Sequence, residues 1–154
     1  MSNFSEIVLM SHVALGMMCI LGGLWVFVDT LNVRETNLPR IRGVSLAVAV
    51  FMWAAFLVGG YWYVVHYAPD KAIILKGPWP FAHSFFMEMK EHVILMLLLL
   101  ATYLPIIAFQ NLSANGKARK TALLVAGLIV LIGFAMDGSG ALIGMGAKLG
   151  AMPH

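Results

Sequence analysis

The apolar residues of this 154-residue chain gather in four long runs, which short polar connections separate. A helix needs about 20 mainly apolar residues to cross the hydrocarbon core of a bilayer. The pattern predicts helices over residues 6–28, 43–67, 80–109 and 121–136. We therefore expect an all-α integral membrane protein, folded as a four-helix up-down bundle in a single transmembrane domain over residues 1–154.

Proline and glycine mark the segments outside these runs. The segment 68–80 contains three prolines and one glycine, which predicts a structured turn rather than a helix. The last of these prolines, Pro80, suits the first turn of the third helix. The segment 137–154 is rich in glycine, and we predict that it forms a tail outside the fourth helix.

The composition supports a membrane protein and excludes other classes. Hydrophobic residues make up 61% of the chain and charged residues only 11%, whereas a soluble domain carries far more charge. The net charge of +3 is small and lies mainly in the connections, so nucleic acid is not an expected partner. Cys19 is the only cysteine, so no disulfide framework is expected. The N-terminus lacks the basic segment typical of a cleaved signal peptide. We therefore expect the first helix to be retained in the mature protein.

Lysine and arginine are distributed unevenly between the two sides of the predicted bundle. The connections after the first and third helices contain Arg34, Arg40, Arg42, Lys117, Arg119 and Lys120. The opposite side contains Lys71, Lys76 and Lys148, and Lys90 lies within the third helix. By the positive-inside rule, the first side faces the cytoplasm. Both termini then lie on the outer side, which is the periplasm for a bacterial inner membrane.

Four histidines map to the outer half of this bundle. His12 lies in the first helix, His66 at the outer end of the second, His83 in the first turn of the third, and His92 about two and a half turns deeper. His12 and His92 are predicted to be buried, and an ionisable group in the apolar region marks a functional site. His66 and His83 are either ligands or ordinary residues of the membrane interface.

The third helix has the densest group of ionisable residues. Glu88 and His92 share one face as an i, i+4 pair. His83 and His92 are nine residues apart and point in nearly opposite directions, so they cannot ligate the same ion. Lys90 is expected to snorkel outward, whereas Glu88 and Glu91 are expected to face the bundle interior or to pair there.

Two neutral imidazoles on facing helices can hold a haem iron from both sides. The helices that carry His12 and His92 are diagonal in an up-down bundle, and the two residues lie at similar depths. We predict that they hold a deeper b-type haem and that His66 and His83 hold a second, shallower haem or contact its propionates. Other pairings remain open, for instance His12 with His83.

Three carboxylates complete the predicted site: Glu88, Glu91 and Asp137. Such groups orient a ligating imidazole or carry protons during quinol chemistry. Asp137 lies at the outer end of the fourth helix. It either takes part in this quinol chemistry or is a helix-end carboxylate in contact with water.

Copper is the alternative metal. Thioether and imidazole ligands suit Cu(I), and five methionines lie near the histidines in sequence: Met10, Met17, Met18, Met87 and Met89. A di-iron centre is disfavoured, because the spacing from Glu88 to His92 is one residue longer than the Glu-x-x-His pattern of di-iron bundles.

Histidines paired across a small four-helix bundle resemble the membrane b-type cytochromes that pass electrons between quinol and periplasmic partners. The resemblance rests on the architecture and on His12, His66, His83 and His92. It implies one or two haem b groups, electron transfer with quinol oxidoreductase activity, and a periplasmic electron carrier as partner. A looser similarity to CopD-like membrane proteins implies copper binding or transport. A cofactor-free anchor subunit of a larger respiratory complex, or a homodimer, also fits the small size.

Overall fold

The computed structural model describes residues 3–152, and these residues form helices without any strand. The elements are α1 (Asn3–Leu31), α2 (Leu38–Lys76), the π-helical segment η1 (Ala82–Met87), α3 (Glu88–Ala108) and α4 (Gly116–Gly150). α1, α2, the continuous η1–α3 helix and α4 are each long and apolar enough to cross a membrane. The predicted all-α class and the four apolar helices are confirmed.

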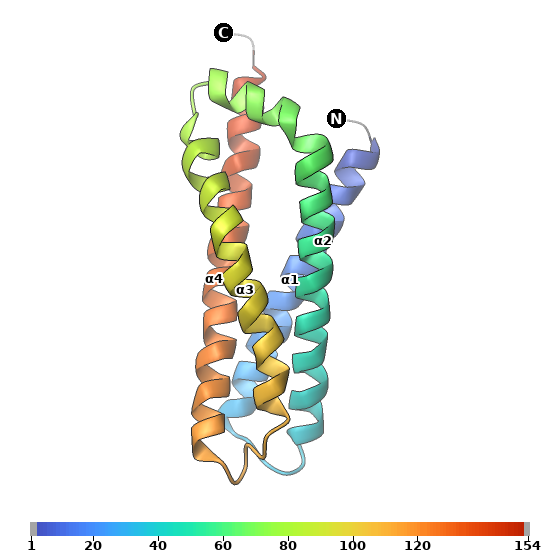
Figure 1. Cartoon of the computed structure of the whole chain (residues 1–154), viewed down its shortest axis with the longest axis vertical. Helices are drawn as coiled ribbons and strands as arrows, with labels where there is room; N and C mark the ends of the chain where they lie inside the picture. Colours follow the sequence, from blue (N-terminus) through green and yellow to red (C-terminus); the bar gives the residue numbers. More distant parts are fainter. Residues whose placement is uncertain (1–2, 153–154) are drawn as a thin grey trace.

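The four helices pack side by side around a common interior. α1 packs against α2 and α4, and α3 packs against the same two helices, whereas α1 and α3 have no backbone contact in residues 3–152. α1 and α3 are therefore the diagonal pair, as predicted. Figure 1 shows both termini at one end of the molecule, which we call the terminal end. The connections 32–37 and 109–115 lie at the opposite end, which we call the loop end.

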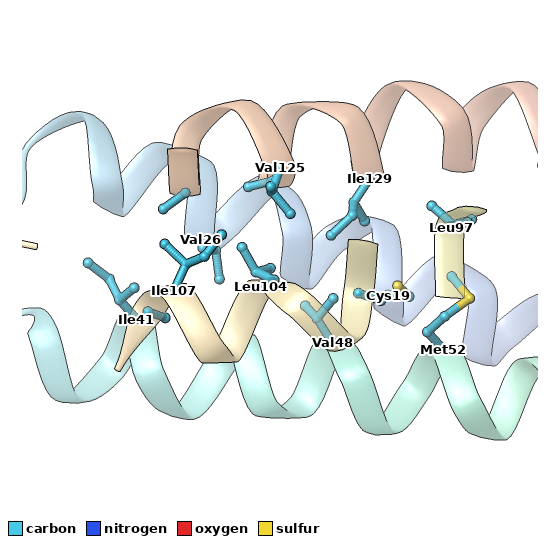
Figure 2. Packing of buried hydrophobic residues seen from close by; sticks show 14 of the residues in the cluster. Cys19, Val26, Ile41, Val48, Met52, Leu97, Leu104, Ile107, Val125 and Ile129 are labelled. Carbon is cyan, nitrogen blue, oxygen red and sulfur yellow. The ribbon is translucent and has the colours of Figure 1, made fainter. Parts of the chain in front are cut away.

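The main core fills the half of the bundle toward the loop end. Figure 2 shows Cys19 and Val26 of α1, Val48 of α2, Leu104 of α3 and Ile129 of α4 directed into the same interior. All five side chains are fully buried. Helices in a bilayer associate through close packing rather than through the hydrophobic effect, so this interdigitation holds the bundle together.

A second core lies at the terminal end and joins η1 to the ends of α2 and α4. Its buried members include Tyr67 and Ile74 of α2, Ala82 of η1 and Ile143 of α4. Gly146 lets α4 approach η1, because a Cβ on this glycine would lie 2.7 Å from the Cβ of Ala82. The terminal end is therefore a packed structure that fixes the position of η1.

The glycine-rich segment after residue 136 is not a separate tail, and that prediction was wrong. α4 continues without interruption to Gly150. Glycine has a low helix propensity. Its small size lets neighbouring helices pack closely, however, and this packing stabilises the helix. Gly146 against Ala82 is one such contact.

The predicted turn over residues 68–80 is likewise shorter than expected. α2 passes through Pro69 and ends only at Lys76. Proline removes a backbone hydrogen bond and bends a helix, and Figure 1 shows the last part of α2 crossing the terminal end toward α4. The backbones meet there, because a Cβ on Gly77 would lie 2.8 Å from the Cα of Gly150. This arm of α2 closes the terminal end of the bundle.

At the loop end, arginines bind the last carbonyls of neighbouring helices. Arg119 of α4 donates to the carbonyl of Thr30 at 3.0 Å, and Arg42 of α2 donates to that of Ala108 at 3.3 Å. The last carbonyls of a helix have no partner within the helix. These arginines satisfy them for α1 and α3, so the residues that create the basic side also fasten the helix ends.

Candidate functional site

His12 projects from α1 onto a notch in α2. Its Nδ1 atom donates to the carbonyl oxygen of Ala55 at 2.8 Å. The ring fits because residue 59 is glycine, since a Cβ there would lie only 2.6 Å from Cε1 of His12. A carbonyl can only accept, so Nδ1 holds the proton and Nε2 keeps its lone pair. Within residues 3–152, Nε2 has no hydrogen bond.

His83 lies in η1 and is only 5% exposed. Its Nδ1 is 3.0 Å from the hydroxyl oxygen of Tyr67, which is itself 2% exposed. This bond again involves Nδ1 and leaves Nε2 unbonded within the part of the chain described. Single π-helical turns occur frequently at functional sites, and here the π-helical segment carries the buried histidine. The structure thus buries the His83 side chain inside the protein, against Tyr67.

A stack of aromatic rings leads from His83 to the surface. The rings of Tyr67 and Tyr63 are stacked with centroids 5.2 Å apart and an interplanar angle of 26°. The Tyr63 hydroxyl donates to the carboxylate of Glu91, which is exposed. Glu91 therefore does not enter the interior, contrary to the sequence expectation, and it holds the outer edge of the tyrosine stack.

His92 is exposed on the surface of the bundle, so the prediction that it is buried was wrong. Its Nδ1 donates to the carbonyl of Glu88 in the preceding turn at 2.7 Å. Glu88 is also exposed, which confirms that the two residues share a face but shows that this face points outward. The predicted opposition of His83 and His92 is confirmed, because one is buried and the other exposed.

His66 occupies a different place, at the α1–α2 contact. Its ring meets the rings of Phe4 and Tyr61 edge to face, with centroids 6.1 and 5.9 Å apart. The Nε2 atom is buried without a hydrogen-bond partner in the described residues. No hydrogen bond or ring contact joins His66 to His83 there.

Lys90 turns toward α4, and the expectation that it snorkels outward was wrong. A Cβ on Gly140 of α4 would lie 3.1 Å from Nζ of Lys90. Asp137 lies three residues earlier on α4 and therefore shares the face of Gly140. The structure thus directs the Lys90 side chain toward the face of α4 that also carries Asp137.

Residues 3–152 contain no group of three or more histidine, cysteine, aspartate or glutamate side chains placed to hold a metal ion. Glu88, Glu91 and His92 do not converge. Of the five methionines near the histidines in sequence, Met87 is buried, whereas Met10 and Met18 are exposed. What the geometry does offer is two imidazoles, a part-buried His12 and a buried His83, each with Nε2 unbonded within residues 3–152.

No protein-family model, curated protein sequence or solved structure matches this chain.

Proposed function

We propose that this chain is a membrane b-type cytochrome that binds haem through His12 and His83 and transfers electrons. One observation carries the proposal: both rings are hydrogen-bonded through Nδ1, and both keep Nε2 unbonded within residues 3–152. A hydrogen bond to the second ring nitrogen is the usual way in which proteins orient a ligating histidine. Haem, when bound, supplies reversible one-electron chemistry.

The donor set fits haem better than it fits a multi-ligand metal ion. Haem would be held by two imidazoles alone, and the described residues offer no larger donor cluster. His12 and His83 belong to α1 and to the η1–α3 helix, which are diagonal across the bundle. Gly59 contributes the space that the His12 ring occupies.

The length of α4 supports a site near the outer membrane surface. Its 35 residues extend over about 52 Å, whereas the hydrocarbon core measures about 30 Å. About 20 residues from Thr121 at the loop end lead to Gly140, the residue beside Lys90. His12 precedes the loop-end terminus of α1 at Leu31 by 19 residues, a similar length of helix, so it also lies near the hydrocarbon boundary. His83 lies beyond it, because its neighbour Ala82 packs on Gly146.

The basic loop end faces the cytoplasm in this proposal, in accordance with the positive-inside rule. Both termini and the haem then face the periplasm of a bacterial inner membrane, in an up-down bundle. A site at this boundary is within reach of a lipid-dissolved quinol and of a water-soluble periplasmic carrier. We propose these two as electron donor and acceptor.

The visible spectrum of the purified protein tests the proposal directly. The chain is expressed with ample haem and purified in detergent, and its absorption is recorded before and after dithionite addition. We expect a Soret band that sharpens and shifts on reduction. If the protein carries no haem, the proposal is wrong, and a stoichiometric copper content in the same sample would support the copper alternative.

Adjacent glycines in α2 provide a matched test of the His12 position. Gly59→Ala is expected to displace the His12 ring and break its bond to Ala55, since the added methyl overlaps the ring. Gly60→Ala adds the same methyl where nothing lies within 4 Å. Both variants gain helix propensity equally, by about 1 kcal/mol.

Haem content per protein is the measurement for this pair. Gly59→Ala should lose most of its haem and Gly60→Ala should match the wild type. Equal haem contents in the two variants would show that the observed position of His12 does not matter for binding.

A further inference from the structure

A hollow lies between α3 and α4 at the loop end, apart from the haem site proposed above. It measures about 230 Å³, and its lining includes Tyr103 and Ile107 of α3, Gln110 beyond the end of α3, and Asn115, Lys117 and Thr121 around the start of α4. Among residues 3–152, no histidine, cysteine or carboxylate contributes to this lining. Metal ions in proteins are bound mainly by those side chains, so the hollow suits an anion better than a metal ion.

Three side chains at the hollow have polar ends that are unpaired within residues 3–152. The amino group of Lys117, the amide of Gln110 and the hydroxyl of Tyr103 make no hydrogen bond in that part of the chain. All three can donate, and phosphate oxygens are strong acceptors for such donors. The first backbone N–H groups of α4 are already bonded, because the side chain of Asn115 accepts from two of them. Recognition at this place therefore depends on side chains and not on the start of the helix alone.

The carboxylates of the loop end do not neutralise Lys117. Asp29 pairs with Arg40 at 2.7 Å, which is the only side-chain ion pair among the described residues. The carboxylate of Glu35 accepts a hydrogen bond from Ser113. Lysines and arginines outnumber these two acidic residues at the loop end. The charge at the hollow is therefore positive and favours an anionic partner.

Toward the middle of the bundle, the helix faces that line the hollow become apolar. Leu99 lies four residues before Tyr103 on α3, and Leu124 lies three residues after Thr121 on α4, so each leucine shares the face of its polar neighbour. Both leucines are exposed, and both helices are apolar enough to cross a membrane. A molecule with an anionic head and apolar chains matches this sequence of surfaces.

We propose that the hollow binds the phosphate group of an anionic phospholipid, whose acyl chains lie along Leu99 and Leu124. Basic sites between membrane helices are a known way of recognising such head groups. Pockets for whole small molecules measure about 300–1,000 Å³, and the smaller hollow observed here suits a head group whose chains remain in the bilayer. The proposal goes beyond electron transfer and does not depend on haem.

Binding of phosphatidylglycerol to the detergent-purified protein tests the proposal. The lipid is titrated from mixed micelles, and bound lipid is counted by native mass spectrometry. Lys117→Gln removes the charge and Tyr103→Phe removes the hydroxyl. Each should weaken binding by about tenfold, the usual effect of losing one hydrogen bond to a charged group. Phosphatidylcholine, which has no net charge, should bind the wild type more weakly than phosphatidylglycerol.

Lys120→Gln is the matched control. It removes the same charge three residues further along α4, from an exposed residue outside the hollow. Any lysine near a membrane surface attracts anionic lipid, so this variant measures the general effect of charge. A larger loss in Lys117→Gln than in Lys120→Gln, with a loss in Tyr103→Phe, supports the site. Equal losses in the two lysine variants, or equal binding of the two lipids by the wild type, overturn it.

Inorganic phosphate distinguishes a lipid site from a site for a free anion. A bound ligand raises the midpoint of thermal unfolding. Phosphatidylglycerol should raise the wild-type midpoint, whereas the same concentration of inorganic phosphate should not, because it lacks the chains that contact the leucines. An equal rise with both would overturn the lipid assignment. Without added lipid, Tyr103→Phe should unfold at the wild-type midpoint, which separates lost binding from lost folding. If Lys117→Gln fails to accumulate, Tyr103→Phe compared with Lys120→Gln still decides the outcome.

Discussion

Replacing His83 with alanine is expected to abolish haem binding. His12→Ala should have the same effect, because each substitution removes one of the two residues proposed to hold the haem. His92→Ala should keep the full haem content, since its ring is exposed and bonded only to the preceding turn of its own helix. The measurement is the ratio of Soret to protein absorption after purification, together with the spectrum of the reduced protein.

Tyr67→Phe separates ligation from ring orientation. It removes the hydroxyl that is bonded to Nδ1 of His83 but keeps the aromatic packing. Loss of such an outer partner typically weakens metal binding by about 10- to 100-fold. We therefore expect weaker haem retention in Tyr67→Phe than in the wild type, and a milder defect than in His83→Ala.

The histidine variants also discriminate between the two pairings. If His12→Ala and His92→Ala both lose the haem while His83→Ala keeps it, the pairing of His12 with His92 is right and the proposal made from the structure is wrong. If all three variants keep the haem, histidine ligation by this set is excluded.

The sequence did not predict which face of α3 points into the bundle. Periodicity correctly placed His83 and His92 on opposite faces and Glu88 with His92. It could not tell which face is internal, because lipid and core are both apolar. Leu99 is 71% exposed and Leu104 fully buried, although the two side chains are chemically identical. Only the packing of α3 against α2 and α4 distinguishes them.

The inward orientation of the Lys90 side chain could not be predicted from the sequence for a related reason. A flexible lysine can point either way from the same backbone position, and its direction here depends on the missing side chain of Gly140 on another helix. The position of the His12 ring likewise depends on the missing side chain of Gly59 on a neighbouring helix. The sequence shows where the glycines lie, but which side chain each of them accommodates depends on how the helices are arranged.

The glycine content of the segment after residue 136 is also the reason why the end of α4 was predicted to be a tail. Gly146→Ala is expected to destabilise the protein, because its methyl would lie 2.7 Å from the Cβ of Ala82. A Cβ belongs to the rigid part of a residue and cannot rotate away. η1 must therefore move from α4, and overpacking of this kind typically costs about 1–3 kcal/mol.

Gly144→Ala is the matched control, since a Cβ at Gly144 has nothing within 4 Å. Alanine improves helix propensity by about 1 kcal/mol at both positions, so the difference between the two variants isolates the packing effect. We expect a lower midpoint of thermal unfolding in detergent for Gly146→Ala, and an unchanged or higher midpoint for Gly144→Ala. Equal midpoints would mean that α4 does not pack on η1 at Gly146. The second core would then not fix His83, and the segment after residue 136 would behave as the loose tail that its glycine content suggests.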